Sequence, residues 1–530
     1  MTHSAPTGHV AVVLHHHLPY IRHPQYPFHL EERWLYEAIT ETYLPLIEAW
    51  RRLERDGVPF CFTTSMTPPL CNMLRDELLG RRYQHHLDTL NELAAKEVLR
   101  TEGTEAAQVA RFYQQRFRDL AALYTAINGD VVGEYRRLME AGHLEIITCT
   151  ATHGFLPLMA GNRGAMKAQI ELACREHERF FGQRPRGIWL AECGYLPGVD
   201  ALLAESGLQY FFVDSHGILH ADSPPVYGVY APILCPGTGV AAFARDPESS
   251  RQVWSAEDGY PGDLNYREYY RDIGWDLDLE DIGPYIHPDG IRINTGLKYH
   301  RITGKTDQKE LYNPEVARQR ADEHAANFMF NRQAQIRWLA GHMDRPPVVV
   351  SPYDAELFGH WWYEGPMFLE ALARHIHADQ SEIALTTPLR YLEAQPENQE
   401  SRPGLSSWGG GGYTAFWCNE NNDWIYRHLH EAARRMEHLA TTFPAAEGLQ
   451  RRALAQAARE LLLAQASDWA FILQTGTTVE YALKRTRDHL AAFHELYDAV
   501  TAGTIDADWL AAREDQWRIF PDLDPALYAG

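Results

Sequence analysis

Short apolar segments alternate with longer amphipathic segments along the first three quarters of the chain. The apolar segments, each typical of a strand, occupy residues 10–14, 58–62, 144–148, 187–191, 209–213, 240–244, 348–352 and 382–386. Several of them are apolar on both faces, as is typical of strands buried in a parallel sheet. Helical patterns separate many of these segments, and the alternation favours an α/β barrel or a doubly wound sheet.

Two other regions lack this alternation and predict helices. Residues from about 75 to 140 are rich in Ala, Leu, Glu and Arg, which indicates a helical insertion in a catalytic barrel over residues 1–395. Residues 396–412 combine Pro, polar residues and four consecutive glycines, so we expect a linker or a loop at the cleft. Beyond it, apolar residues recur every three or four positions, which predicts a helical C-terminal domain over residues 413–530.

Charge and cysteine content exclude several classes of protein. The chain carries 71 acidic and 49 basic side chains, a net charge of −22, which argues against nucleic acid or an anionic membrane as partner. No apolar run approaches the roughly 20 residues that span a bilayer, and the first residues lack the features of a signal peptide. The seven cysteines show no CxxC spacing, which is typical of reduced thiols. We therefore expect a cytoplasmic protein.

Chemically active side chains follow most of the predicted strands. They are His15, His16, His17, Thr63, Thr64, Ser65, His153, Glu192, Asp214, His216, Arg245, Asp354 and Glu356. In a parallel barrel the carboxyl ends of the strands build the active site. One polar residue at a strand end is equally consistent with the start of a loop. Because six of the eight segments end in His, Asp, Glu or Arg, a shared catalytic face is the better interpretation.

Two acidic residues stand out because each follows an apolar segment that should be buried. Glu192 lies in GIWLAECGYLPG and Asp354 in VVVSPYDAELFGHWW. A buried carboxylate is unfavourable without a partner or a purpose. Two carboxylates across a cleft are the groups that glycoside hydrolysis requires, one as nucleophile and one as proton donor. A strand-capping or arginine-paired role for either residue is equally consistent with the spacing.

The aromatic residues favour a sugar as ligand. The chain has 14 tryptophans, and several aromatic residues lie among Gly, Asp and Asn instead of apolar runs, namely Trp254, Trp275, Trp361, Trp362, Tyr363, Trp408 and Trp417. Flat rings beside hydrogen-bonding groups suit sugars, which have apolar C–H faces and a rim of hydroxyls. Some of these rings are also expected in the core, as in any large protein.

The histidines leave a metal hypothesis open. On a strand, His15 and His17 share one face while His16 points to the other. This pair with a carboxylate could bind a metal, as in a metal-dependent deacetylase, although no HExxH or similar spacing supports that reading. Neutral histidines that hold sugar hydroxyls explain the pattern equally well. The glycines at 409–412 lack the lysine, strand and helix of a phosphate-binding loop, so no nucleotide cofactor is expected.

Taken together, the motifs resemble glycoside hydrolase family 57 and, within it, the 1,4-α-glucan branching enzymes. The resemblance runs nearly end to end, through HHHLPY, EIITCTATHGFLPL, GIWLAECGY, SPYDAELFGHWWYEGP, ARDPESSRQVWSAEDGYPGD, SSWGGGGYTAFWCNENNDWIY and ASDWAFIL. It implies a (β/α)7 barrel with a helical insertion and a helical C-terminal domain. It also implies a retaining mechanism that needs no metal and no other cofactor, in a monomer or weak homodimer.

The resemblance also implies roles for individual residues. Glu192 matches the nucleophile and Asp354 the general acid/base. The positions that match glucan contacts are His15, His17, Trp34, His153, Arg245, Trp254, Gly262, Trp408, Trp417 and Asp468. The expected reaction cleaves an α-1,4 linkage and transfers the chain to a 6-hydroxyl, which makes an α-1,6 branch of glycogen. Alternatives within the family are an α-amylase and a 4-α-glucanotransferase; outside it, a metal-dependent deacetylase and a non-catalytic glucan-binding protein.

One segment departs from the branching pattern. Branching members resemble one another in a long loop that carries a tyrosine over the cleft, whereas residues 221–240 look too short to do so, although Tyr227 and Tyr230 are present. Exclusion of water separates transfer from hydrolysis. The short segment therefore predicts a larger share of hydrolysis.

Overall fold

The computed structural model describes residues 5–255 and 258–529. Two residues of the ARDPESSRQVWSAEDGYPGD motif, Ala256 and Glu257, lie outside this range. In the described part of the chain nine strands form one sheet in the order β6-β7-β5-β4-β3-β2-β1-β8, and β9 pairs with the start of β1. Their bounds are β1 Gly8–His16, β2 Phe62–Met66, β3 Leu144–Cys149, β4 Gly187–Trp189, β5 Tyr210–Val213, β6 Ile233–Leu234, β7 Ala241–Ala244, β8 Val348–Asp354 and β9 Ile383–Leu385.

The sheet is a parallel barrel apart from β6, which pairs antiparallel with β7. Successive parallel strands are neighbours, and β8 returns to pair with β1. The segment after β7 contacts β8, which closes the barrel. There the Asp246 N–H donates to the Val350 carbonyl (2.9 Å), and the Ser351 hydroxyl contacts the Ser249 hydroxyl (2.9 Å). The carboxyl ends of all the parallel strands therefore point to one end of the barrel, as the sequence predicts.

The predicted strands match the observed ones except at β2. The segment predicted at 58–62 is shifted, because the strand begins at Phe62 and continues to Met66. Thr63, Thr64 and Ser65, expected after the strand, lie within it and are fully buried. Threonine is β-branched and suits a strand, but its hydroxyl makes a buried strand look like a loop in the sequence.

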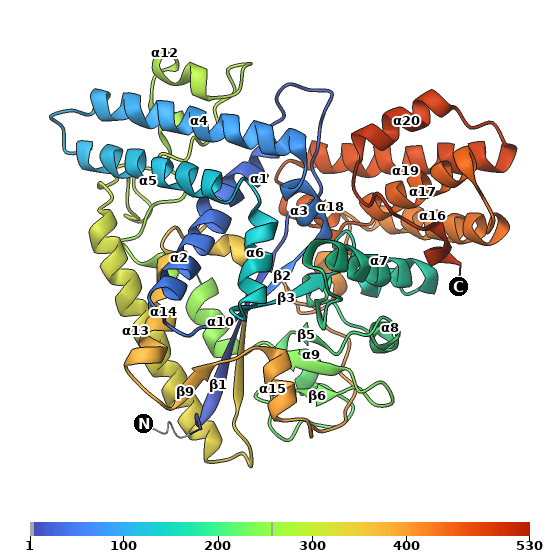
Figure 1. Ribbon diagram of the computed structural model, residues 1–530, viewed down its shortest axis with the longest axis horizontal. Helices are drawn as coiled ribbons and strands as arrows, with labels where there is room; N and C mark the ends of the chain where they lie inside the picture. The colour runs from blue at the N-terminus through green and yellow to red at the C-terminus, as the bar shows by residue number, and fades with distance from the viewer. Residues whose placement is uncertain (1–4, 256–257, 530) are drawn as a thin grey trace.

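Helices cover the barrel and extend it at one end. The helices of the barrel region are α1 Glu32–Ala38, α2 Leu44–Arg55, α3 Pro68–Leu74, α6 Val131–Glu140, α7 Arg163–Phe181, α8 Val199–Glu205, α9 Ser215–Leu219, α10 Pro247–Trp254, α11 Ile273–Asp276, α12 Leu279–Ile282, α13 Pro314–Ala340, α14 Gly365–Ala378 and α15 Pro388–Ala394. The insertion is a pair of long helices, α4 Glu77–Arg100 and α5 Ala107–Ala126, that pack side by side (Figure 1).

The C-terminal part is a bundle of helices on one side of the barrel (Figure 1). It comprises α16 Trp424–Thr442, α17 Gly448–Ala464, α18 Ser467–Thr475, α19 Val479–Ala502 and α20 Ala507–Gln516, with α17 and α19 packed together at its centre. A last short turn, η8 Pro525–Tyr528, returns to pack on α7 of the barrel. The bundle is therefore attached to the barrel both through its first residues and through its end.

The seven cysteines are all free thiols. Among the described residues, no helix combines the length and the apolar character that a membrane span requires.

Candidate active site

The carboxyl ends of seven strands bring polar side chains together at one end of the barrel. In chain order these are His15 from β1, Ser65 from β2, His153 after β3, Glu192 after β4, Asp214 after β5, Arg245 after β7 and Asp354 from β8. Asp354 lies beside His15 in the register of β1 and β8. The structure thus places these residues on one face at the carboxyl ends of the strands, as the sequence predicts.

Glu192 is held from the C-terminal half of the chain. Its backbone has a left-handed conformation (φ +61°), uncommon for a residue other than glycine. One carboxylate oxygen accepts a hydrogen bond from the Trp408 indole N–H (2.8 Å) and the other from the Ser467 hydroxyl (2.9 Å). Burial raises the pKa of Glu192, while these two hydrogen bonds oppose the rise because they stabilise the charged form. The side chain is 8 % exposed, so its orientation is fixed by these two donors.

Asp354 has a different environment. Within residues 5–255 and 258–529 its carboxyl group has no hydrogen-bond or ion-pair partner, and it is only partly buried. Burial, followed by the nearby Glu356 and Glu192 carboxylates, raises the pKa of Asp354 well above its usual range. The two carboxyl groups thus differ: hydrogen bonds support the charged form of Glu192, whereas none supports that of Asp354. This is the division of roles that nucleophile and proton donor require.

A third carboxyl group lies next to the pair. Glu356 accepts a hydrogen bond from the Tyr43 hydroxyl (2.6 Å) and one from the backbone N–H of His17 (3.3 Å). Burial raises the pKa of Glu356 to about 7. Because Glu356 in turn raises the pKa of Asp354, it acts on the proton donor through its charge.

The histidines form one stacked group. His15 and His153 contact each other through their Nε2 atoms (3.0 Å), and the ring of His17 stacks on that of His153 (3.8 Å between centroids). His17 also hydrogen-bonds both carboxylate oxygens of Asp468 on α18 (3.0 and 3.1 Å). Burial lowers the pKa of His15 and His153 well below its usual range, so both are neutral at physiological pH. Neutral imidazoles can donate to and accept from sugar hydroxyls.

The same side chains include two groups with metal-ligand chemistry. One consists of His17, His153 and Asp468, and the other of His15, Cys149 and His153. Their donor atoms already bond to one another or to neighbours, since His17 binds Asp468, and His153 binds His15 and the Ser467 hydroxyl (2.8 Å). A metal would have to replace these contacts.

Aromatic and cationic groups surround Glu192. Trp408 lies close to Trp254 (6.1 Å between ring centroids, edge to face) and beneath the guanidinium of Arg245 (5.9 Å). Arg245 forms an ion pair with Asp214. The structure therefore brings Arg245, Trp254 and Trp408 together, as expected from the sequence, around the nucleophile candidate.

Three other candidate residues contact other parts of the chain. Trp417 is 1 % exposed and stacks on Phe155 (4.9 Å), so it belongs to the core and offers no exposed face to a glucan. It supports the glycine-rich loop, because a Cβ on Gly409 would come within 3.0 Å of its ring. Trp34 on α1 contacts Tyr481 of the C-terminal bundle. Gly262 ends the short turn Tyr260–Gly262, whose Tyr260 packs on His324 of α13.

The short segment 221–240 is attached to the barrel away from the carboxylates. The carbonyl of Tyr230 accepts a hydrogen bond from Val348, the first residue of β8, and the ring of Tyr227 lies under Arg345 (5.3 Å). Both tyrosines thus lie near the amino end of the barrel. Neither reaches over the cleft, in agreement with the interpretation of this segment as a shortened loop.

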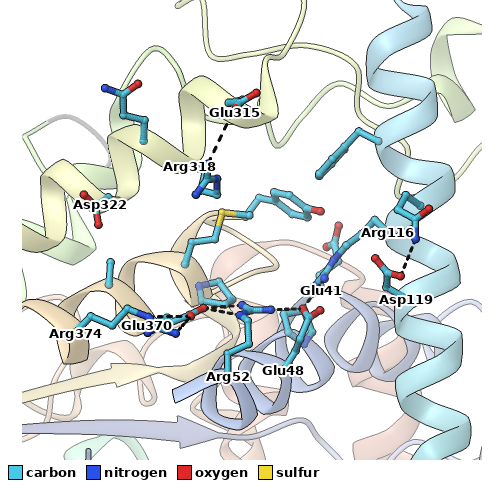
Figure 2. Close-up of a pocket in the computed structure, with 18 residues that line it drawn as sticks. Glu41, Glu48, Arg52, Arg116, Asp119, Glu315, Arg318, Asp322, Glu370 and Arg374 are labelled. Atoms are coloured by element: carbon cyan, nitrogen blue, oxygen red, sulfur yellow. Dashed lines mark hydrogen bonds and ion pairs between the residues drawn. The ribbon is translucent and has the colours of Figure 1, made fainter. Parts of the chain in front are cut away.

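A cavity of about 840 Å³ lies outside the barrel between α2, α5, α13 and α14 (Figure 2). Its walls carry alternating arginines and carboxylates, of which Arg52, Arg116 and Arg374 pair with Glu48 or Glu370. None of the strand-end residues described above lines it. It is therefore separate from the candidate active site.

Comparisons with known proteins decide the family. Residues 11–403, more than half of the chain, match the pattern described as glycosyl hydrolase family 57. The chain belongs to this family. Residues 428–528 match the pattern described as 1,4-alpha-glucan branching enzyme, C-terminal. Because the match to family 57 covers the barrel with both carboxylates, the predicted resemblance is confirmed.

Similar proteins include both branching enzymes and an amylase. The 1,4-alpha-glucan branching enzyme of Thermococcus kodakarensis is 35 % identical over 96 % of this chain and 77 % of its own length. The structure of a family 57 branching enzyme from Pyrococcus horikoshii is 32 % identical, with a TM-score of 0.89 over 99 % of this chain and 97 % of that one. The structure of the alpha-amylase AmyC from Thermotoga maritima is 45 % identical, with a TM-score of 0.93 over 99 % of both chains. These matches confirm the predicted family 57 barrel with its helical C-terminal domain.

Sequence reasoning missed two residues of the site. The Ser467 hydroxyl donates to Glu192 and accepts from His153, yet a lone serine carries no signal beyond its place next to Asp468 in ASDWAFIL. Glu356 was noted only as a strand-end residue. Its carboxyl lies against Tyr43, which is 313 residues away in sequence, and no local pattern indicates that contact.

The hydrogen bond from Trp408 predicts the behaviour of a Trp408→Phe variant. Loss of the indole N–H removes a donor that stabilises the Glu192 carboxylate, so the pKa of Glu192 rises and the acidic limb of the kcat/KM profile moves to higher pH. We expect kcat to fall roughly 100-fold, as for other lost donors in active sites. The control is Trp362→Phe, because the indole N–H of Trp362 is buried and has no hydrogen-bond partner in the described part of the chain. Equal effects of the two variants would contradict this role.

The position of Glu356 predicts a shift in the basic limb of the kcat/KM profile against pH. In a Glu356→Gln variant the negative charge that raises the pKa of Asp354 is gone, so Asp354 loses its proton at lower pH. The basic limb of the kcat/KM profile is therefore expected to move to lower pH, measured across the range with one glucan substrate. A control variant is Glu310→Gln, whose carboxylate is exposed. An unmoved basic limb in Glu356→Gln would show that Asp354 does not sense Glu356.

The hydrogen bonds within the histidine group predict that the reaction is independent of metal. Activity is expected to be unchanged after exhaustive dialysis against a chelator, because His17 already binds Asp468, and His153 already binds His15 and Ser467. Metal content by mass spectrometry and activity are measured on the same sample. A stoichiometric metal whose removal abolishes activity would overturn this prediction and favour deacetylase-type chemistry.

Proposed function

We propose that this chain is a retaining, α-glucan-active 1,4-α-glucan branching enzyme that works in the cytoplasm in glycogen synthesis. The observation that carries the proposal is the asymmetry of the two carboxyl groups. Glu192 accepts two hydrogen bonds that favour its charged form, whereas the pKa of Asp354 is raised and no donor among the described residues reaches its carboxyl group. A charged nucleophile beside a protonated acid is the arrangement required to break a glycosidic bond with retention.

In the first step Glu192 attacks the anomeric carbon of an α-1,4-linked glucose unit. The bond to the departing chain breaks, and Asp354 gives its proton to the leaving oxygen, so that the departing chain leaves with a free 4-hydroxyl. The product is a glucosyl ester on Glu192 and an ionised Asp354. Trp408 and Ser467 keep the attacking carboxylate in place, and Arg245 lies nearby as a positive group.

In the second step a 6-hydroxyl of another glucan attacks the same carbon. Asp354 takes the proton of that hydroxyl, the ester bond to Glu192 breaks, and an α-1,6 linkage forms. Both carboxyl groups return to their starting states. Two inversions at one carbon give net retention.

The C-terminal half supports transfer as the outcome. Trp408, Ser467 and Asp468 reach the active site from outside the barrel sequence, so this half forms part of the wall where an acceptor would lie. Its match to the branching-enzyme C-terminal pattern and the names of several relatives agree with that role. A held acceptor competes with water because positioning contributes roughly 7–11 kcal/mol.

An α-amylase is the second candidate. AmyC, at 45 % identity over 99 % of the chain, is named an alpha-amylase, and segment 221–240 leaves the cleft uncovered by either of its tyrosines. With less cover over the glucosyl ester, water has easier access to it. We therefore infer that the enzyme branches glucans and hydrolyses a larger share of them than a long-loop branching enzyme does.

The test is to incubate the purified protein with amylose and to count new α-1,6 linkages and new reducing ends in the same samples. Branching predicts that new linkages outnumber new reducing ends, while an amylase produces reducing ends alone. A 4-α-glucanotransferase would redistribute chain lengths with neither change. A branching enzyme that carries the long loop serves as reference, and an equal ratio in both enzymes would contradict the inference about segment 221–240.

Two variants connect the products to the proposed residues. Glu192→Gln and Asp354→Asn are each expected to lower the rate by several orders of magnitude while the thermal midpoint stays close to that of the wild type. Proton NMR of the first-formed product should give the α-anomer, since retention preserves the configuration. First-formed β-anomer would rule out the two-step mechanism.

A further inference from the structure

Beyond Asp354 the chain carries aromatic residues that the reaction does not use. Trp361 follows seven residues after Asp354, and its backbone N–H donates to the Glu356 carbonyl (3.2 Å). With that hydrogen bond in place, the Cα atoms of Asp354 and Trp361 lie within about 15 Å of each other. Trp361 is therefore on the same end of the barrel as the carboxyl groups.

Trp361 and its neighbour Trp362 have opposite environments. Trp362 is buried and packs on Phe358 and Phe368, so it is a core residue. Trp361 is 52 % exposed, and its ring stacks on that of Tyr269 (4.3 Å between centroids, 25° between planes). Packing in the core accounts for the position of Trp362, but it does not account for the exposed position of Trp361.

A third ring completes an exposed aromatic surface. Tyr270 is 81 % exposed and meets Tyr269 edge to face (5.0 Å). We refer to Tyr269, Tyr270 and Trp361 as the outer aromatic platform. Exposed apolar rings gathered in one place usually mark a binding site.

Buried polar groups hold this platform from below. The Tyr269 hydroxyl contacts His360 (3.2 Å), whose other ring nitrogen bonds Glu41 (2.7 Å), and Glu41 pairs with the buried Arg267 (2.8 Å). From another side the Lys298 ammonium donates to the Tyr269 carbonyl (2.6 Å) and lies 4.1 Å from the centre of its ring. These contacts fix the ring of Tyr269, and through stacking that of Trp361, before any ligand arrives.

We propose that the outer aromatic platform is a second glucan-binding site, which holds an α-glucan chain by the apolar C–H faces of its sugar rings outside the reacting positions. The inference rests on the proposed function, because it takes the ligand to be the same class of polymer. A site close to Asp354 but outside the cleft would retain a long chain between successive reactions. The enzyme would then favour long glucans over short ones.

The size of the platform favours a single glucan chain over a protein. An aromatic side chain buries at most about 150–250 Å². Three partly covered rings therefore offer a few hundred Å², whereas a stable protein interface needs roughly 800 Å² from each partner. A sugar chain needs only two or three rings in contact.

The first test measures binding in a catalytically inactive background. Glu192→Gln protein is run in gels that contain amylopectin, alone and with Trp361→Ala or Tyr270→Ala added. We expect each added change to weaken retardation by roughly tenfold, the loss that truncation of a central aromatic contact gives. The matched control is Trp338→Ala on α13, because Trp338 is 63 % exposed and its neighbour Arg337 binds Glu382 beside the amino end of β1. Unchanged retardation in both platform variants would overturn the proposal.

The second test separates this site from the active site. In otherwise active enzyme, KM is measured on amylose and on maltotetraose for the wild type, Trp361→Ala and Trp338→Ala. The proposal requires the rise in KM for Trp361→Ala to be at least about fivefold larger on amylose than on maltotetraose. Equal rises on the two substrates would place Trp361 in the reacting positions instead and would overturn the proposal.

The outcomes also distinguish failure of this inference from failure of the proposed function. If the wild type makes branches or reducing ends while both platform variants bind amylopectin as the control does, the platform is wrong and the function stands. If the Glu192→Gln protein is not retarded by amylopectin and the wild type does not act on glucans, the proposed function itself is wrong. Sedimentation velocity adds one outcome: self-association that Trp361→Ala abolishes without change in glucan affinity would make the platform a protein interface.

Discussion

The hydrogen bonds that Glu192 accepts from Trp408 and Ser467 are the contacts on which the arrangement of this molecule depends. The barrel supplies Glu192 at the end of β4, but both donors come from the chain beyond residue 400. A carboxylate in a buried position is stabilised only if donors reach it. The C-terminal bundle therefore has a chemical role in addition to its structural one.

The backbone around this contact is also unusual. Three residues close to the site, His153, Glu192 and Cys193, have left-handed conformations with φ between +51° and +61°. Each such conformation costs about 1–3 kcal/mol, which the surrounding contacts must offset. Ser467 provides some of these contacts, since its backbone N–H donates to the His153 carbonyl (3.1 Å) while its hydroxyl binds Glu192. One serine thus stabilises two strained turns at once.

The parts of the site that could be predicted from the sequence are those with a local signal. Most parallel strands are visible in the sequence as apolar runs. A functional residue at the carboxyl end of such a strand can then be predicted from its position just after the run, as for Glu192 and Asp354. The strand at β2 was misplaced because Thr63, Thr64 and Ser65 are polar yet buried. Contacts between distant segments leave no such signal: the burial of Trp417 against Phe155 and the bond between Tyr43 and Glu356 depend on how the barrel and bundle meet.

The attachment of the last residues to the barrel has a consequence for how the enzyme is made. The turn Pro525–Tyr528 packs on α7, where the Tyr528 carbonyl lies so close to Gly164 that a Cβ there would come within 2.7 Å of it. During synthesis a ribosome completes the barrel strands before it reaches Ser467, and η8 follows later than Ser467. In a nascent chain that ends before Ser467, Glu192 consequently lacks the hydrogen bond from Ser467, and α7 lacks its contact with η8. The full set of donors to Glu192 therefore comes together only after the bundle has been synthesised.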